Sequence, residues 1–431
     1  MIDEIPQNPS LKHLARRALE QASALASAFP GRGSATQAEA AAAEHVHRQL
    51  AALGVTNVRT QTFQGQRSIW LFLAQAFGLA LVGLAAVFLL VPPLGKYAAL
   101  LISVVFFALS FLQLWRKFTF QPLLAHAGKN SLGVKPRQSS LPSGASQNIV
   151  SVIPSAAAAE RRVVLLAHLD SHRAVWLFAH PLIVRAYSFL SPMALYGVLA
   201  APLFYAAALL AGISVLSWLA LLLAVIHFIA WFTGVTADLG PYSPGANDDA
   251  SAVGSLLALA ERLQVEPLAR TEVWLVFTGC EESGGEGMLH FLAEYGETLK
   301  DALFIDLELV GIGDRLAFLE NEGMLRPRTI SPAVRKQVQA AAQHLAERNA
   351  EGEGSGSMPI IQPVRGALRG VFTEMNIAWE QGFQGVCLTV GSSVDGSLPQ
   401  WHRLTDIPQN FQEIAFACTH AFVWELLQVN D

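Results

Sequence analysis

The sequence predicts a three-layer α/β domain with a mixed β-sheet, into which two transmembrane helical hairpins are inserted. The first observation behind this prediction is that strand-like and helical segments alternate outside two apolar regions, as they do when helices cover a sheet. The second is that the apolar regions contain four uncharged runs, each about long enough to cross a hydrocarbon core of ~30 Å. The third is composition. The 431 residues are 52% hydrophobic and only 15% charged, a balance that is unusual for a soluble protein.

Charge and cysteine content exclude some classes of protein. The net charge is −5, so no broad basic surface for nucleic acid is expected. The three cysteines are widely separated and form no CxxC pair, which argues against disulfides and favours a reducing compartment. The amino-terminal segment MIDEIPQNPS is acidic and polar, and we do not expect it to be a signal peptide.

The first predicted hairpin spans residues 69–114. Residues 69–91 and 97–114 carry no charge, and Pro92, Pro93 and Gly95 lie between them. Proline and glycine interrupt helices, so we expect two antiparallel spans that are joined at these residues.

The second predicted hairpin comprises residues 189–211 and 214–232. The preceding segment 174–188 is apolar but short, and it carries Pro181 and Arg185, which indicates an interfacial or partly buried segment. Core helices of a large soluble protein are the alternative to membrane spans, but four such runs are hard to bury in a soluble core. His227 lies inside the last run, where a hydrogen bond between helices is the favoured interpretation.

Two hairpins make an even number of crossings, so all polar segments lie on one side of the membrane. The polar side is flanked by seven basic residues, whereas the hairpin tips carry only Lys96. The seven are Arg67, Arg116, Lys117, Lys129, Lys135, Arg137 and Arg173. The positive-inside tendency then predicts a cytoplasmic polar domain. The predicted division of the chain is 1–68, 115–173 and 235–431 for this domain, with 69–114 as the first hairpin and 174–234 as the interfacial segment plus the second hairpin.

The polar segments predict the layers of the domain. Residues 11–53 are helical in pattern, and the helix over 37–53 begins with Thr36 as N-cap and Glu39 as the partner of a capping box. The other expected strands are 57–63, 148–153, 163–167, 273–278, 303–309 and 386–390, and the other helices are 250–263, 288–295, 334–349 and 411–427. The stretch EGEGSGSM at 351–358 reads as a flexible loop.

Histidines and carboxylates follow the strands. They are His168 and Asp170 in VVLLAHLDS, Asp248 and Asp249 in PGANDDASAVG, Glu281 and Glu282 in WLVFTGCEESGGEG, Asp306 and Glu308 in LFIDLELVG, and His402 and Asp406 in PQWHRLTD. Ligands collect at the carboxyl ends of strands in such sheets. Carboxylates with one or two imidazoles suit zinc or another divalent first-row metal. One carboxylate can bridge two cations, and the small residues around Asp248 leave room for that arrangement.

These five motifs, in this order, resemble the M28 family of zinc-dependent peptidases, which includes bacterial aminopeptidases. The resemblance covers most of the polar segments, with the two hairpins as insertions. It implies that His168, Asp248 and Glu308 hold one zinc ion, and that Asp248, Glu282 and His402 hold a second. It also implies that Glu281 is the general base and that Asp170 orients His168. Similar peptidases carry a cis peptide bond after the bridging aspartate, so one is expected between Asp248 and Asp249.

One position departs from the usual pattern of the family. Aspartate is the commoner residue three positions before the glycine of the fourth motif, and here Glu308 stands there, before Gly311. Asp306 lies two residues earlier and on the same face of a strand. We favour Glu308 as the ligand. Asp249 is expected to be structural, and Asp406 to steady the loop of His402. His172, His180 and His290 are expected to be ordinary solvated or packed histidines.

The resemblance implies a membrane-bound, two-zinc peptidase that hydrolyses peptide substrates, with aminopeptidase activity as the default. The expected partners are the peptide substrate and the lipid bilayer. Two alternatives remain open at this point: a single-zinc acyltransferase similar to glutaminyl cyclases, and a non-catalytic binding protein of the same fold beside the membrane.

Overall fold

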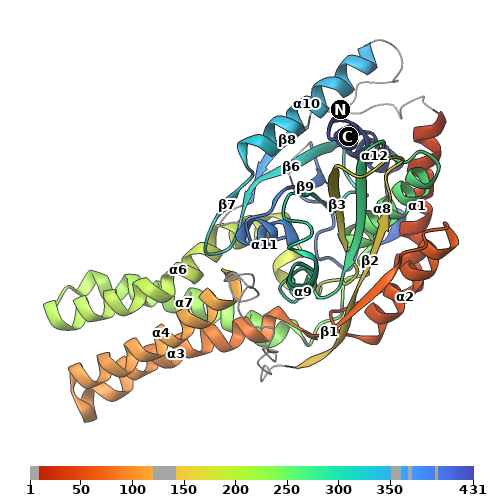
Figure 1. Cartoon of the computed structure of the whole chain (residues 1–431). Coiled ribbons are helices and arrows are strands. Elements are labelled where there is room, and N and C mark those ends of the chain that lie inside the picture. Colours follow the sequence, from red (N-terminus) through yellow and green to blue (C-terminus); the bar gives the residue numbers. More distant parts are fainter. Residues whose placement is uncertain (1–8, 120–141, 351–360, 367–370, 394–396) are drawn as a thin grey trace.

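One mixed sheet organises the chain (Figure 1). The computed structural model describes residues 9–119, 142–350, 361–366, 371–393 and 397–431, so the expected loop at 351–358 lies outside the described residues. The sheet has nine strands in the order β1-β2-β4-β3-β5-β9-β6-β7, with β8 paired to β6. The strands are β1 Arg59–Gln66, β2 Ser143–Ile153, β3 Arg161–His168, β4 Thr271–Thr278, β5 Leu303–Glu308, β6 Arg315–Glu322, β7 Arg328–Thr329, β8 Gln362–Arg365 and β9 Gln384–Gly391.

The centre of the sheet is parallel. Strand β3 pairs in parallel with β4 and with β5, and β5 pairs in parallel with β9. Antiparallel pairs flank this centre, with β1 and β2 on one side and β6 on the other. The carboxyl ends of β3, β4, β5 and β9 therefore meet at one edge of the sheet, where strands of this kind collect ligands.

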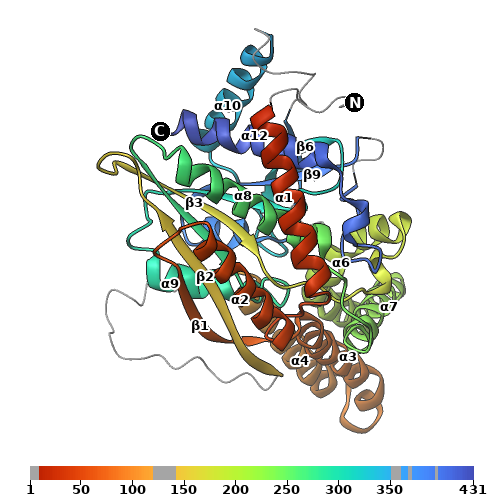
Figure 2. The ribbon, with the colours of Figure 1, turned by 90° about the vertical axis from the view of Figure 1, so that its right-hand side faces the viewer.

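Helices cover both faces of the sheet, so the predicted three layers are confirmed. One face carries α1 Pro9–Ala28, α2 Gln37–Ala52, α8 Ser251–Val265, α10 Pro332–Ala350 and α12 Glu413–Val429, and the other carries α9 Glu286–Tyr295 and α11 Glu374–Glu380. Figure 2 shows α1 and α2 in front of the sheet. Strand β3 explains the arrangement. Val163, Leu165 and Ala167 face one core, while Val164 and Leu166 face the other, as expected for a strand buried on both faces.

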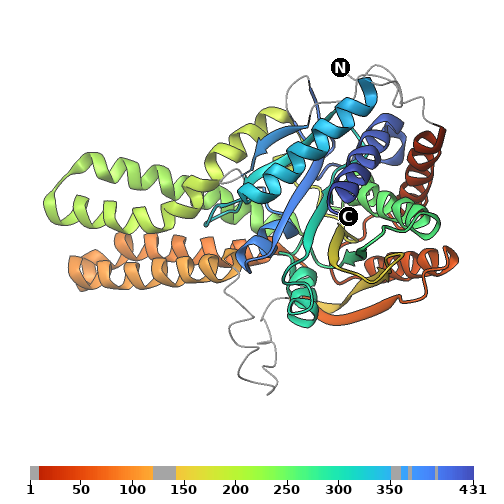
Figure 3. The ribbon, with the colours of Figure 1, turned by 45° about the horizontal axis from the view of Figure 1, so that its top comes forward.

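Four long apolar helices extend from this α/β body as two hairpins that lie side by side (Figures 1 and 3). They are α3 Ile69–Leu94 with α4 Lys96–Phe118, and α6 Pro181–Ala211 with α7 Ser214–Ala237. All four are long and apolar enough to cross a membrane. Large apolar side chains such as Phe88, Leu203 and Trp218 are 61%, 69% and 71% exposed, which lipid would tolerate and water would not.

The hairpins differ from expectation in two places. Pro92 and Pro93 were expected to lie between the two helices of the first hairpin. They lie instead in the last turn of α3. The chain turns only at Gly95, whose φ of 81° suits glycine because that residue lacks a Cβ. The second hairpin also begins earlier than expected, since residues 181–188 of the segment expected to be interfacial or partly buried belong to its first helix. After a short 3₁₀ turn at Trp176–Phe178, the chain enters α6 at Pro181, and proline suits the first position of a helix.

Contacts between helices hold the hairpins together. The predicted hydrogen bond of His227 is confirmed, since its Nε2 lies 3.1 Å from the carbonyl oxygen of Ala194 on the neighbouring helix α6. Gly234 allows α7 to approach α3 closely, because a Cβ there would lie 2.7 Å from the carbonyl oxygen of Trp70. Small residues at such crossings are typical of membrane helix pairs.

A close crossing of α1 and α8 supports the body and generates a prediction. A Cβ on Gly254 would lie 2.4 Å from the carbonyl oxygen of Ala18 and 2.6 Å from the backbone nitrogen of Ala22. Helix propensity alone favours alanine over glycine by about 1 kcal/mol, but the clash is with backbone, which cannot move away alone. We expect Gly254→Ala to destabilise the protein by about 1–3 kcal/mol, measured as a lower unfolding temperature of the purified protein. The control is Gln264→Ala on the exposed end of the same helix. An unchanged or raised unfolding temperature for Gly254→Ala would show that the two helices do not cross this closely.

Candidate metal centre

The edge formed by the carboxyl ends of the parallel strands gathers the predicted site residues. His168 is the last residue of β3, Glu308 is the last residue of β5, and Glu281 and Glu282 follow β4. Asp248 lies in the short turn Ala246–Ala250 before α8, and its own backbone there is not helical. His402 comes from the segment between β9 and α12. The side chains of His168, Asp248, Glu281, Glu308 and His402 are buried, and Glu282 is half-buried.

The Asp248 carboxylate lies between two histidines. Its Oδ1 is 3.2 Å from Nε2 of His168, and its Oδ2 is 3.2 Å from Nε2 of His402. Each histidine has a second carboxylate beside it. Oε2 of Glu308 is 3.6 Å from Nε2 of His168, and Oε2 of Glu282 is 3.4 Å from Nε2 of His402. The two triads that the resemblance implied are thus present as two adjacent clusters that share Asp248.

The chemistry of these donors fits cations. The Nδ1 of His168 lies 3.1 Å from the carbonyl oxygen of Asp170. A proton on Nδ1 would be donated there and would leave the Nε2 lone pair directed at two carboxylates. That arrangement is favourable with a cation between them, either a second proton on the ring or a metal ion. In addition, Oε1 of Glu281 and Oε1 of Glu282 are buried without a hydrogen-bond partner among the described residues. Carboxylate and imidazole ligands suit zinc.

The protonation of Asp248 also suits a bridging role. Burial alone would raise the pKa of this carboxyl group, but the hydrogen bonds and charges of His168 and His402 outweigh burial and hold the pKa below its usual range. Glu281 differs, because burial raises the pKa of its carboxyl group well above the usual range and the nearby Glu282 adds to the rise, although His168 opposes it. Bound cations would favour the carboxylate form of Glu281.

Backbone hydrogen bonds hold the turn that carries Asp248. The peptide bond between Asp248 and Asp249 is cis, as predicted. Asp249 accepts a hydrogen bond from the backbone N–H of His168 at 3.1 Å, so its structural role is consistent with the contacts. Asp406 accepts hydrogen bonds from the N–H groups of Asn247 (2.7 Å) and Asp248 (3.1 Å). Asp406 therefore joins the segment of His402 to the Asp248 turn.

Asp170 acts through different atoms than expected. Its carboxylate Oδ1 is 3.6 Å from Nδ1 of His168, so the closer contact to that ring comes from the backbone carbonyl. The carboxylate accepts hydrogen bonds from the N–H groups of Glu281 (3.0 Å) and Glu282 (3.1 Å) and from the hydroxyl of Ser34 (2.5 Å). The backbone carbonyl group of Asp170 thus makes the closer contact with His168, while its side chain also fixes the glutamate pair.

Two supporting residues were missed in the sequence. Glu39 was assigned only to a capping box, and half of that box forms, since the hydroxyl of Thr36 accepts from the N–H of Glu39 at 3.4 Å. The Glu39 carboxylate instead accepts from the N–H groups of Ala35 (3.0 Å) and Cys280 (2.8 Å), and so holds the residue before the glutamate pair. Burial raises its pKa to about 8, with a further contribution from Asp170.

Arg32 is the second missed residue. Its fully buried guanidinium donates hydrogen bonds to the carbonyl oxygens of Leu169 (2.8 Å), Pro244 (3.2 Å) and Gly245 (2.8 Å). These bonds tie the end of β3 to the turn of Asp248. The only sequence signal was its place in the glycine-rich stretch PGRGS, which does not distinguish a buried arginine from a loop arginine.

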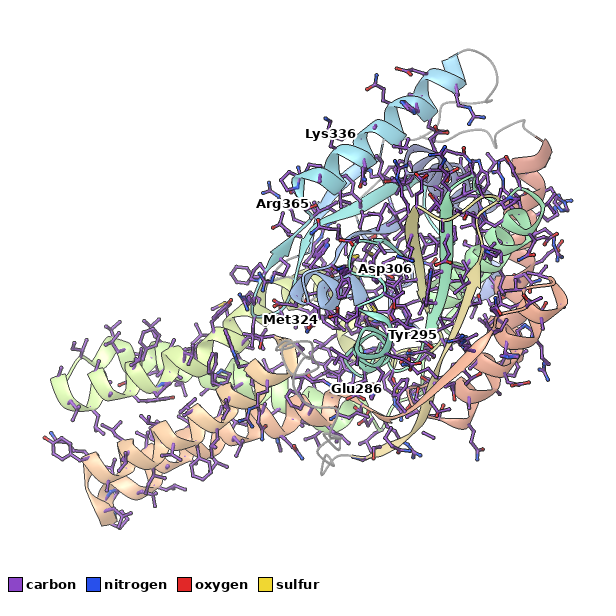
Figure 4. The ribbon with its side chains drawn as sticks, viewed as in Figure 1. Glu286, Tyr295, Asp306, Met324, Lys336 and Arg365 are labelled. Carbon is purple, nitrogen blue, oxygen red and sulfur yellow. The ribbon has the colours of Figure 1, made fainter. Side chains whose placement is uncertain are left out.

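The geometry distinguishes Glu308 from Asp306. Glu308 lies in the cluster with His168 and Asp248, whereas Asp306 is in none of the three potential ligand groups found among the described residues. Figure 4 shows Asp306 in the interior of the body. Burial raises the pKa of Asp306, and the carboxyl group of Glu374 adds to that rise. Asp306 thus belongs to a buried acidic group beside the site, in which Glu374 also accepts a hydrogen bond from Thr278.

The three histidines that were expected to be ordinary have different surroundings. His180 caps α6 by accepting from the N–H of Leu182, and His290 stacks on Phe63, so both lie in local packing. His172 lies at the site. Its ring stacks on His402 at a centroid distance of 3.7 Å. Its Nε2 accepts a hydrogen bond from the indole N–H of Trp70 at 3.2 Å, and its Nδ1 faces the carbonyl oxygen of Arg173 at 2.8 Å. His172 also belongs to one of the three potential ligand groups, with Glu282 and His402. Since both of its ring nitrogens already have a hydrogen-bond partner, a positioning role is favoured over metal binding.

Comparison with known protein families relates the chain to zinc-dependent peptidases. Residues 225–421 match the model of Peptidase family M28. Comparison with curated protein sequences gave no significant match.

Solved structures match over nearly the whole chain. One is a Zn-dependent exopeptidase from Parabacteroides distasonis, with 14% identity, 96% of this chain and 97% of that chain covered, and a TM-score of 0.54. A second is a leucine aminopeptidase precursor from Bacteroides thetaiotaomicron, with 14% identity, 99% of both chains covered and a TM-score of 0.52. A third is a glutaminyl cyclase from Bacteroides thetaiotaomicron bound to N-acetylhistamine, with 13% identity, 99% of both chains covered and a TM-score of 0.53. The family match over residues 225–421 and the fold of the α/β body thus relate this chain to peptidase family M28.

Proposed function

We propose that this protein is a membrane-bound aminopeptidase with a two-zinc site. The observation that carries the proposal is the position of Asp248, whose two carboxylate oxygens each face a different histidine at 3.2 Å. A further carboxylate lies beside each histidine, Glu308 beside His168 and Glu282 beside His402. Two ligand sets of three residues therefore share one bridging aspartate. Two-metal hydrolases use such a bridge.

In this proposal His168, Asp248 and Glu308 hold one zinc ion, and Asp248, Glu282 and His402 hold the other. Bound zinc would lower the pKa of a water molecule and polarise the substrate carbonyl group. The task of Glu281 is to move the proton. Its backbone is fixed by Asp170 and its carboxylate lines the cavity beside the ligands. There it can accept a proton from the attacking water and pass it to the leaving amine.

The alternative of a single-zinc acyltransferase draws support from the glutaminyl cyclases among the structures of similar fold. The cluster of His168 with Glu308 on the second side of Asp248 favours two ions, because this cluster offers a complete second ligand set. A non-catalytic binding protein is favoured less, since neither ligand set lacks a member. Metal analysis of the purified protein, beside a panel of aminoacyl substrates, tests these functions. Two zinc ions per chain with release of amino-terminal residues support the proposal, and one zinc with cyclisation of glutaminyl peptides supports the alternative.

Replacing the two neighbouring glutamates should separate base from ligand. We expect Glu281→Gln to keep its zinc content within about 20% of wild type and to lose hydrolysis by about 100-fold or more, as general-base catalysis typically contributes 10²–10⁴-fold. Glu282→Gln should instead lower the zinc content, because it weakens one ligand set. Zinc per chain by elemental analysis and turnover of an aminoacyl substrate are the two readouts. Substantial turnover by Glu281→Gln would show that Glu281 is not the general base.

The choice between the two carboxylates of β5 has a similar test. Glu308→Ala should lose about one zinc ion per chain, because Glu308 lies beside His168 and its loss leaves that set with two ligands. Asp306→Asn should keep both ions, since Asp306 is outside the ligand groups found among the described residues. Full zinc occupancy in Glu308→Ala together with loss in Asp306→Asn would shift the ligand by two residues along the strand.

The cytoplasmic orientation rests on the distribution of basic residues and can be tested by labelling. The three native cysteines are buried, so an added exposed cysteine can be followed alone. Tyr97 is 72% exposed at the tip of the first hairpin, and Val265 is 85% exposed on the body. In intact cells we expect a membrane-impermeant maleimide to label Tyr97→Cys, and to label Val265→Cys only after permeabilisation. The reverse pattern would place the body outside the cytoplasm.

A further inference from the structure

The cavity above the ligands is walled by the hairpins as well as by the body. The cavity has a volume of about 110 Å³, and its lining includes the site residues Asp248, Glu281 and His402. Most of its other lining is apolar or aromatic. The hairpins contribute Ile69, Leu73, Phe118 and Tyr187, and the body adds Phe372 and Trp401. Such a lining suits an apolar segment of a substrate. Because these hairpin residues lie at the ends of α3, α4 and α6 nearest the body, the cavity is placed where the proposed spans would leave the membrane.

The hairpin ends are also tied directly to the site. Trp70, in the first turn of α3, donates to His172, which stacks on His402. At the end of α4, Lys117 contacts Gln66 at 3.1 Å and Glu286 at 3.5 Å, and it packs against Gly284, where a Cβ would lie 2.5 Å from its Cε. Figure 4 shows Glu286 and Met324 on the side of the body nearest the hairpins. The position of the site relative to the hairpins is thus fixed by side-chain contacts.

An apolar rim is carried by segments that adjoin the lining residues Phe178 and His402 of this cavity. We define it as Trp176, Leu182, Leu239 and Leu404, which are 46%, 64%, 84% and 55% exposed. The segments that carry the rim are bonded together. The N–H of Ala174 donates to the carbonyl oxygen of Pro241 at 3.0 Å, and the guanidinium of Arg403 donates to the carbonyl oxygen of Phe178 at 2.8 Å. Large apolar side chains exposed together mark a surface for lipid or for a partner. Here they adjoin the ends of α6 and α7, which favours lipid.

Given the proposed aminopeptidase function and membrane insertion, we propose that the substrate is the amino-terminal end of a membrane-anchored polypeptide, presented at the bilayer surface. The cavity lies at the level of the hairpin ends, so a chain that emerges from the same bilayer needs only a few residues to reach it, at ~3.3 Å per extended residue. In this proposal the apolar rim contacts the lipid and holds the cavity close to the bilayer surface. Confinement to the membrane raises the effective concentration of such a substrate without any new contact.

The test compares three peptides with the same free amino-terminal sequence and the zinc-loaded protein in phospholipid vesicles. The first carries a dialkyl lipid at its carboxyl end after a spacer of about six residues, the second lacks the lipid, and the third carries the lipid after a polar spacer of about forty residues. Lipopeptides insert from outside, so all three reach the same population of protein molecules. The initial rate of amino-acid release is measured at equal total peptide concentration. We expect the first peptide to be cleaved ~10-fold or more faster than the second, and at least as fast as the third.

Variants sharpen the comparison. The double substitution Leu239→Ser with Leu404→Ser should lower the ratio of the first rate to the second by several-fold, whereas Val265→Ser, at an equally exposed site on α8, should leave that ratio unchanged. The proposal is overturned if the unanchored peptide is cleaved as fast as the first, or if only the long spacer allows cleavage, because the site would then face away from the bilayer. Cleavage of none of the three peptides would overturn the proposed aminopeptidase function and this inference with it.

Discussion

The sharing of one buried carboxylate by two histidines is the interaction on which the site depends. That carboxylate belongs to Asp248. Its side chain is 3% exposed and its two oxygens point to opposite clusters. An ionised carboxylate costs several kcal/mol to bury unless it is paired, and the pairing here comes from groups that are themselves zinc ligands by type. The sheet edge, the turn and the segment of His402 must all be in place for this one carboxylate to be tolerated.

The surrounding structure reaches the ligands mainly through backbone hydrogen bonds. Arg32 binds the carbonyl groups on both sides of the gap between β3 and the Asp248 turn. Asp170, Glu39 and Asp406 accept from N–H groups next to the ligands or of the ligands themselves. These supporting side chains form hydrogen bonds to the backbone of the site segments. The side chains of the proposed ligands therefore stay free to face a cation, and supporting residues of a metal site commonly act in this way. The cost is a set of buried acidic groups close together, and burial accordingly raises the pKa of Glu39 and Asp306.

Much of this arrangement could be predicted from the sequence because it follows from local patterns. The strand ends place His168, Glu281 and Glu308 at one edge, since parallel strands end together. The hairpins follow from uncharged runs of sufficient length. Strands β6, β7 and β8 and helix α11 were missed. β7 and β8 are two and four residues long, and such segments form because neighbouring strands offer hydrogen bonds, which a local pattern does not reveal. Pro92 and Pro93 were taken as helix breakers, but at the last turn of a helix little remains to be broken.

The links between distant segments were the least predictable part. Nothing local in PGRGS indicates that Arg32 reaches Gly245, and nothing around Trp70, at the start of a long apolar helix, indicates that it binds His172 beside the proposed ligands. These contacts arise from the folding of separate segments around one site. The hairpins therefore have a second structural role. The same helices that would anchor the protein also form part of the wall of its cavity.

The central claim is that Asp248 bridges two cations, and anomalous scattering from crystals of the zinc-loaded protein at the zinc absorption edge tests it most directly. If Asp248 bridges two cations, two zinc peaks lie ~3.5–4 Å apart, one beside His168 and Glu308 and the other beside His402 and Glu282, with an Asp248 oxygen on each. A single peak, or two peaks of which one lies away from Asp248, would contradict it.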